Sequence, residues 1–164
     1  GLASSLATES QVAAFREVWL RVPDRLTGHP GDAYLLVSDI MGATEPLLEA
    51  VKRRQADELD STYPDGNAPK VVLDRHHREL GRATDALYVA GLELLASLYR
   101  DVAAAQFGSP VQNADVPVST FTRIDAGVAI AHVERIMEAI EALEANQRPQ
   151  LALASLFVDI GPDA

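Results

Sequence analysis

The stretch KVVLDRHHRELGRATDALYVAGLELLASLYRDVAAAQ, residues 70–106, decides the fold that the sequence predicts. Leucines recur in it every seven residues, a spacing that returns to one face of an α-helix. Mostly small residues repeat with the same period on both flanks, which lets a neighbouring helix approach closely. The pattern predicts one long helix over about 70–106 whose leucine seam is Leu73, Leu80, Leu87 and Leu94, with flanks of Ala83, Ala90, Ser97 and Ala104 and of Thr84, Gly91, Leu98 and Ala105.

The length of this helix predicts contact with another subunit. At about 1.5 Å per residue, a helix of about 36 residues is about 54 Å long. A compact domain of 164 residues is only about 40 Å across. Because the seam continues through Gly81 and Gly91, we expect one end of the helix to project and to meet a partner. The sequence therefore predicts a homo-oligomer, most simply a homodimer.

Two helical segments precede the long helix. Residues 8–11, TESQ, have the form of a capping box, and apolar residues at helical spacing follow as far as Val22. A second helix is predicted over about 33–60, with Asp32 as its N-cap. Pro46 lies inside it, and because proline removes a backbone donor we expect a kink or a break near residues 42–44.

Two further segments follow the long helix. Residues 120–146 carry an apolar stripe, with Ser119 or Thr122 as a candidate cap. Pro149 precedes a short apolar segment, 151–160, which we interpret as a helix with proline in its first turn. Apolar and polar residues partly alternate in this segment, so a β-strand is the alternative interpretation. The prediction is an all-α protein with a four- to five-helix bundle, a kinked second helix and a long third helix. Residues 1–164 form a single domain, with residues 1–8 as a flexible N-terminal arm.

Composition narrows the classes of partner. The chain has 26 alanines, which favour helix, and a net charge of −10 without a longer basic run than residues 52–54. Acidic surfaces repel phosphate backbones, so we expect no nucleic-acid binding. The longest apolar run, residues 86–99, contains Glu93 and is too short for a membrane span. The lack of cysteine and of a secretory leader pattern leads us to expect a cytoplasmic protein.

The segment RHHRELGRATDAL, residues 75–87, is the first place to look for chemistry. Asp74 and His77 lie one turn apart on one helical face, and helical bundles bind metals through such carboxylate–histidine pairs. Those sites use two pairs, whereas His132 has Ala129 three residues before it, and only Asp125, two turns before, shares its side. The alternative interpretation is an ordinary charged surface, in which Asp74–Arg78, Arg75–Glu79 and Arg82–Asp85 form ion pairs along the helix.

The two adjacent histidines are predicted to differ. His76 shares a line with Ala83 and Ala90, the small-residue flank that a neighbouring helix should cover. His77 lies beside Asp74 on the opposite flank. We expect His76 to be the more buried of the two, and His77 to remain accessible for ligand or proton chemistry.

The order of the segments resembles that of the all-α nucleotide pyrophosphohydrolases of the MazG type. The matching parts are LLVSDIMGATEPLLEAVKRR, residues 35–54, and RELGRATDAL, residues 78–87. The resemblance implies a magnesium site on carboxylates such as Asp39, Glu45 and Glu49. The chain departs from the pattern at Gly42, where a paired glutamate is expected, and at Arg82, where an aspartate is expected. Mg²⁺ needs several oxygen ligands, so these departures argue against such a site.

The residues allow two functional hypotheses. The first is an oligomeric, cytoplasmic helical protein that binds a small ligand or a protein partner, with Asp125 and Tyr88 as ligand-binding candidates and no catalysis assigned. The second is a small-molecule enzyme, hydrolase-like and with or without a metal, whose catalytic candidates are His77, Asp74 and His132. Phosphate-binding glycine loops and catalytic serine motifs do not occur in the sequence. Neither hypothesis assigns a cofactor or a particular metal.

Overall fold

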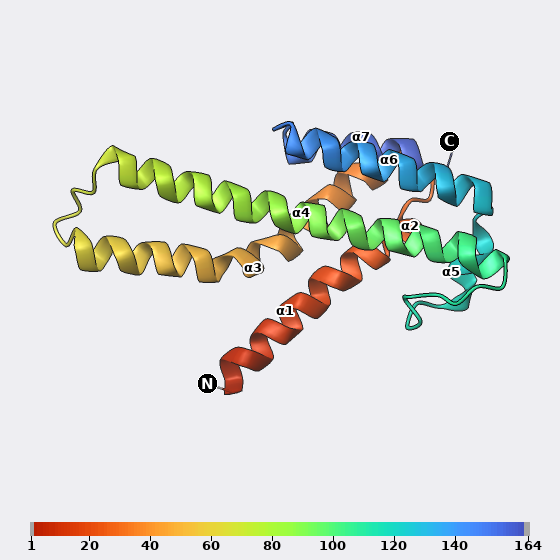
Figure 1. The fold of residues 1–164 in the computed structure, drawn as a ribbon, viewed down its shortest axis with the longest axis horizontal. Helices are drawn as coiled ribbons and strands as arrows, with labels where there is room; N and C mark the ends of the chain where they lie inside the picture. The colour runs from red at the N-terminus through yellow and green to blue at the C-terminus, as the bar shows by residue number, and fades with distance from the viewer. Residues whose placement is uncertain (1, 163–164) are drawn as a thin grey trace.

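The computed structural model describes residues 2–162, with side chains from residue 8 onward. Within this range every helix or strand assigned is an α-helix, so the all-α prediction is confirmed, although there are more helices than the four or five predicted. They are α1 (Leu2–Leu20), α2 (Val22–Arg25), α3 (Asp32–Thr62), α4 (Lys70–Gln106), α5 (Val118–Arg123), α6 (Ala126–Glu144) and α7 (Pro149–Ile160) (Figure 1). No helix among the described residues is both long enough and apolar enough to cross a membrane.

The long third helix of the prediction is confirmed as α4, which has 37 residues and continues through both glycines. α3 also runs unbroken through Pro46, so a break near residues 42–44 is excluded, while the kink stays a prediction. α7 confirms the short terminal helix with Pro149 in its first turn.

Two predicted helix starts are wrong. α1 begins at Leu2, so the capping box at residues 8–11 lies inside the helix, because the alanines and leucines before it already favour helix. The predicted flexible arm, residues 1–8, thus falls within α1 apart from Gly1, which lies outside the described residues; its mobility stays a prediction. Asp32 is the first residue of α3, and Gly31 is the N-cap.

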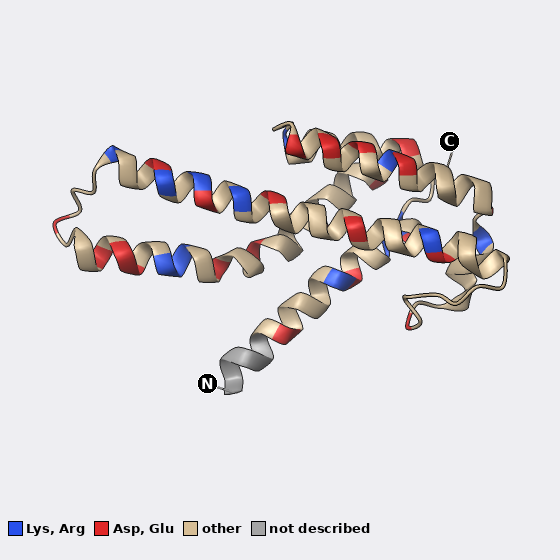
Figure 2. Ribbon diagram, in the orientation of Figure 1, with Lys and Arg blue, Asp and Glu red and all other residues tan. Residues whose placement is uncertain are grey.

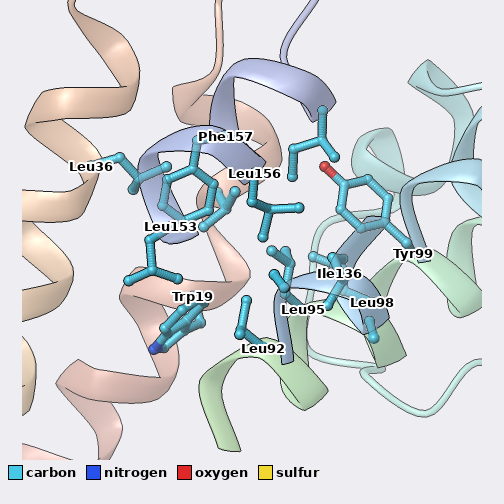
Figure 3. Close-up of a cluster of buried hydrophobic side chains, with 14 of the residues drawn as sticks. Trp19, Leu36, Leu92, Leu95, Leu98, Tyr99, Ile136, Leu153, Leu156 and Phe157 are labelled. Carbon is cyan, nitrogen blue, oxygen red and sulfur yellow. The ribbon is translucent and has the colours of Figure 1, made fainter. Parts of the chain in front are cut away.

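The core surrounds the second half of α4, which packs against α1, α3, α5 and α6, while α7 covers α3 and α6. Trp19 is fully buried, and its ring lies 6.4 Å from that of Phe157. Leucines from α3, α4 and α7 surround these rings, and Tyr99 and Ile136 close the far side (Figure 3). The close contact of α1 with α4 depends on Gly91, because a Cβ there would lie only 2.0 Å from Trp19 Cε2.

The leucine seam is not the centre of this packing. Leu73 is 47% exposed, and the other three seam leucines are only partly buried. The buried face of the second half of α4 instead includes Tyr88, Leu92, Leu95, Tyr99 and Val102. Apolar residues are dense enough on α4 to support both stripes, and the position of its neighbours selects the one that is buried.

The first half of α4 and the second half of α3 form a helical hairpin, residues 49–87, that projects from the rest of the chain (Figure 1). No residue of α3 beyond Leu48 is buried, and only Val72 and His76 are buried in the α4 part of the hairpin. The predicted projecting end of the long helix is therefore observed, and it is α3 that covers one of its sides.

The long loop between α4 and α5 is fastened to α4 by a buried carboxylate. Asp101 is 3% exposed and accepts three hydrogen bonds, from the backbone N–H of Gln112 and of Asn113, both at 2.8 Å, and from Asn113 Nδ2 at 2.7 Å. The amide of Asn113 also donates to Ser97 Oγ at 3.1 Å. A carboxylate whose lone pairs are used in this way is compatible with burial.

Candidate functional site

The structure places the predicted site residues in separate regions. Asp74 and His77 lie exposed on the hairpin, whereas His132 and Asp125 belong to α6 and its N-terminus. His132 contacts Tyr99, which follows His77 by 22 residues of one helix, a distance of about 33 Å. The three catalytic candidates Asp74, His77 and His132 therefore do not meet in one site within the chain.

The difference between the two adjacent histidines is confirmed. His76 is 6% exposed and His77 is exposed. The covering element is α3 rather than a helix on the small-residue flank, since Ala90 is exposed. Glu58 Oε2 lies 3.0 Å from His76 Nε2, and Gln55 donates to the His76 carbonyl at 2.9 Å. These bonds give His76 a role in fastening the hairpin.

The ion pairs of the hairpin connect its two helices. Arg75 pairs with Glu58, and Arg54 pairs with Glu79. Hydrogen bonding to His76, followed by the charge of Arg75, lowers the pKa of Glu58 below its usual range. The three pairs predicted along α4 do not occur in the described chain. For Arg75 and Glu79 the reason is that Glu58 and Arg54 of α3 are their partners instead.

The carboxylates of the magnesium hypothesis do not gather. Asp39 forms an ion pair with Arg25 at 2.5 Å. Glu45 and Glu49 both contact Lys52 Nζ, at 2.8 and 3.7 Å. Across residues 2–162 there is no group of three His, Cys, Asp or Glu side chains that could hold a metal ion.

A pocket lies instead at the end of the chain's packed part where α2, α5, α6 and α7 meet the second half of α4. Its volume is about 660 Å³, within the range of small-molecule sites. Its apolar wall is formed by Pro23, Leu26, Ile124, Val128, Ile160 and Pro162. Its polar lining includes Asp24, Tyr99, Arg123, Asp125, His132 and Asp159. Two predicted site residues, His132 and Asp125, therefore line one cavity.

The wall at α6 exists because the predicted helix 120–146 is interrupted. Neither Ser119 nor Thr122 caps α6; Asp125 does, and its carboxylate accepts from the Gly127 N–H at 2.9 Å. Gln106 at the end of α4 holds the junction, because its amide donates to the Ile124 carbonyl and accepts from the Ala126 N–H at 2.9 Å. Asp125 thus has a structural role at the rim of the pocket.

The opposite wall is a turn organised by Asp32. Its carboxylate accepts from the Thr27 N–H and hydroxyl, both at 2.8 Å, and from the His29 N–H at 3.2 Å. These hydrogen bonds, those of Thr27 first, lower the pKa of Asp32. The turn holds Leu26 and Thr27 against the pocket.

His132 is the most distinctive group in the pocket. Its ring packs edge-on against Tyr99 with centroids 4.9 Å apart, and its Nδ1 is buried without a hydrogen-bond partner in the described chain. Burial lowers the pKa of the imidazole, so the ring is neutral at neutral pH. Burial also raises the pKa of the Tyr99 hydroxyl, which therefore stays a hydrogen-bond donor.

The pocket carries more negative than positive charge. Asp24 binds Arg123 at 2.6 Å, which compensates both groups. Asp159 pairs with Arg135, and Asp125 has no ion-pair partner among residues 2–162. A neutral imidazole adds no charge, so the lining favours neutral or cationic molecules over anions.

Tyr88, the other predicted ligand-binding residue, lies elsewhere. It is 5% exposed and belongs to the hydrophobic core, and it does not line the pocket. Asp24 and Arg123 carry no motif or spacing signal in the sequence, and the spacing of Tyr99 fits the edge of a core as well as the wall of a pocket. The apolar spacing places Tyr99 on the predicted long helix, but nothing in the local sequence indicates that His132 of α6 contacts it.

Protonation of His132 is expected to destabilise the fold as the pH falls. An imidazole whose pKa in the folded state is below its unfolded value of about 6.5 takes up its proton more readily when the chain unfolds. Its stabilising contribution is therefore complete above about pH 6.5 and decreases as the pH falls toward the folded-state pKa. The melting temperature of the wild type should fall between pH 7 and pH 5 by more than that of His132→Gln. The exposed His77→Gln is the matched control, and equal pH dependence of wild type and His132→Gln would contradict the prediction.

Compared with protein-family models, with curated proteins and with solved structures, the chain matches none. The resemblance of segment order to the MazG-type enzymes is thus not supported by a family match.

Proposed function

We propose that the protein binds a small organic ligand in the end pocket, through apolar contacts and a hydrogen bond to His132. The observation that carries the proposal is a half-buried imidazole, without a hydrogen-bond partner in the described chain, on the wall of a cavity of about 660 Å³. A buried polar group left unpaired costs about 1–3 kcal/mol. A ligand that supplies the missing partner removes that cost once the ring turns its buried Nδ1 toward the cavity.

The lining also indicates the class of ligand. Six apolar side chains offer an aliphatic or aromatic body a place to bind. Asp125 and the ion pair of Asp24 with Arg123 provide charged and hydrogen-bonding groups for the polar part of the ligand. Because the net charge of these groups is negative, the ligand proposed is neutral or cationic, with at least one hydrogen-bonding group directed at His132.

Screening of small fragments by NMR tests this proposal. A set with equal numbers of neutral, cationic and anionic members should give hits among the first two classes that shift the side-chain signals of His132 and the amide signals of Val128 and Gly161. His132→Ala should weaken those hits about tenfold, the loss expected for one good hydrogen bond of about 1.4 kcal/mol.

The matched control is His77→Ala, since His77 is exposed on the distant hairpin and does not line the pocket. It should leave the affinities unchanged. Hits dominated by anions, or hits whose affinity is the same in His132→Ala and wild type, would contradict the proposed site.

A second candidate is catalysis in the same pocket, with His132 as the general base. It is favoured by the lowered pKa, because a base must be unprotonated at the working pH. Asp74 and His77 take no part in this version of the enzyme hypothesis. Chemical conversion of a bound fragment by the wild type but not by His132→Gln would support it over simple binding.

A further inference from the structure

The projecting hairpin, residues 49–87, differs in charge from the rest of the chain. It contains seven of the fourteen Lys and Arg residues but only eight of the twenty-four Asp and Glu residues, a net charge of −1, whereas the remaining residues carry −9 (Figure 2). Two molecules of net charge −10 repel each other. The hairpin is therefore the part that another copy can approach at the lowest electrostatic cost.

One exposed side of α4 in this hairpin presents a basic stripe, Arg75, Arg78 and Arg82. Their spacing of three and four places them on one side of the helix, and all three are exposed. Arg75 is compensated by Glu58. Arg78 and Arg82 have no ion-pair partner in the part of the chain that the structure describes, and Val71, 68% exposed, extends the same side.

α6 presents the complementary surface, an acidic stripe of Glu134, Glu138 and Glu141. These residues are exposed and spaced by four and three. Glu138 pairs with Arg135, whereas Glu134 and Glu141 have no ion-pair partner within residues 2–162. Ile130 and Met137, 51% and 42% exposed, lie along the same side of α6. The end residues of both stripes lie seven positions apart, about 10 Å, so their charges can align over their whole length.

The two stripes do not meet within one chain. α6 packs along the second half of α4, where His132 contacts Tyr99, and α4 is one continuous helix. Among the described residues no ion pair joins the hairpin to α6. We propose that the basic stripe of one copy docks on the acidic stripe of a second copy, and reciprocally, in a two-fold homodimer. Val71, Ile130 and Met137 add apolar contacts that exposed ion pairs alone do not provide.

Salt dependence is the first property expected of this dimer. The Debye length falls from about 10 Å at 0.1 M salt to about 3 Å at 1 M. Sedimentation velocity over a concentration series should show a dimer whose dissociation constant rises at least tenfold between these conditions. A wild type that remains monomeric at all concentrations tested, or an association indifferent to salt, would overturn the proposal.

Charge exchange tests the partner. Arg78→Glu with Arg82→Glu, and separately Glu134→Arg with Glu141→Arg, should each raise the dissociation constant at least tenfold. Mixing the two double variants should restore association as a heterodimer. The hairpin made acidic in the first variant then meets the α6 made basic in the second, and the native basic hairpin of the second meets the native acidic α6 of the first. A chain carrying all four substitutions should again form homodimers.

The control for net charge is Arg100→Glu with Arg148→Glu, which removes the same charge from exposed positions outside both stripes. It should preserve the dimer apart from a weak general effect. Circular dichroism and melting curves establish that each variant is folded. Dimers that persist in both double variants, or a mixture that stays monomeric although both variants are folded, would show that these stripes are not the interface.

Discussion

Replacing Gly91 by alanine should lower the free energy of unfolding by about 3 kcal/mol, the upper range for inserting a carbon into a packed core. The ideal Cβ would lie 2.0 Å from Trp19 Cε2 and 2.2 Å from Trp19 Nε1, and the ring is fully buried. The indole cannot retreat without disturbing Phe15 and Phe157, which pack on it. For a chain of this size the melting temperature should fall by about 6–12 °C, measured by calorimetry or circular dichroism.

Gly81 in the same helix provides the matched control. A Cβ at Gly81 meets nothing within 4 Å, so alanine there should stabilise the protein by about 0.5–1 kcal/mol through helix propensity alone. Combining Gly91→Ala with Trp19→Phe should cost less than the sum of the two single changes, because the smaller ring removes the collision. Equal effects of alanine at the two glycines would show that α1 does not pack on α4 as described.

Replacing Asp101 by alanine should also cost about 3 kcal/mol. Two backbone N–H groups and the Asn113 amide would lose their acceptor, and each buried donor left unpaired costs about 1–3 kcal/mol, with water compensating in part at the exposed Gln112. Chemical denaturation measures the loss. Amide hydrogen exchange at Gln112 and Asn113 should become faster at the same time.

The control is Asp115→Ala in the same loop. Asp115 binds Arg16 at 2.6 Å, but its side chain is 64% exposed, so its loss should cost far less stability than the loss of Asp101. A similar effect of the two substitutions would show that the loop is not fastened through Asp101. The sequence alone gave no reason to rank these aspartates, because burial separates them and burial comes from the packing of the loop on α4.

The sequence was sufficient to predict those features of the fold that depend on the local spacing of apolar residues. The bounds of α4, its continuity through two glycines and the proline start of α7 all follow from apolar spacing and from the backbone chemistry of single residues. The break between α5 and α6 could have been anticipated, because Asp125 is followed by Ala126 and Gly127 and aspartate is a strong N-cap. The continuous apolar stripe through residues 129–143 instead led to the prediction of one helix over 120–146.

The residues of the candidate site could be predicted from the sequence only in part. Helical spacing pairs Asp125 with His132 and Asp74 with His77. The structure places the first pair on one pocket and the second on the far hairpin. Tyr88 and Tyr99 have similar sequence surroundings, yet only Tyr99 reaches the pocket. Which titratable groups share a cavity depends on contacts between residues far apart in the chain, and local spacing carries no information about them.

The sequence by itself determined that this protein is helical and that one helix is long enough to project. Both properties follow from hydrogen bonds and side-chain spacing within single segments. Only the tertiary structure decided which face of α4 is buried. The leucine seam and the stripe through Leu92 and Leu95 are both apolar, and the packing of α1, α3 and α6 against α4 buries the second of them. Side-chain volume at a helix contact is a property of two segments together, so the pairing of helices, the pocket and the exposed charge stripes are fixed only when the chain folds.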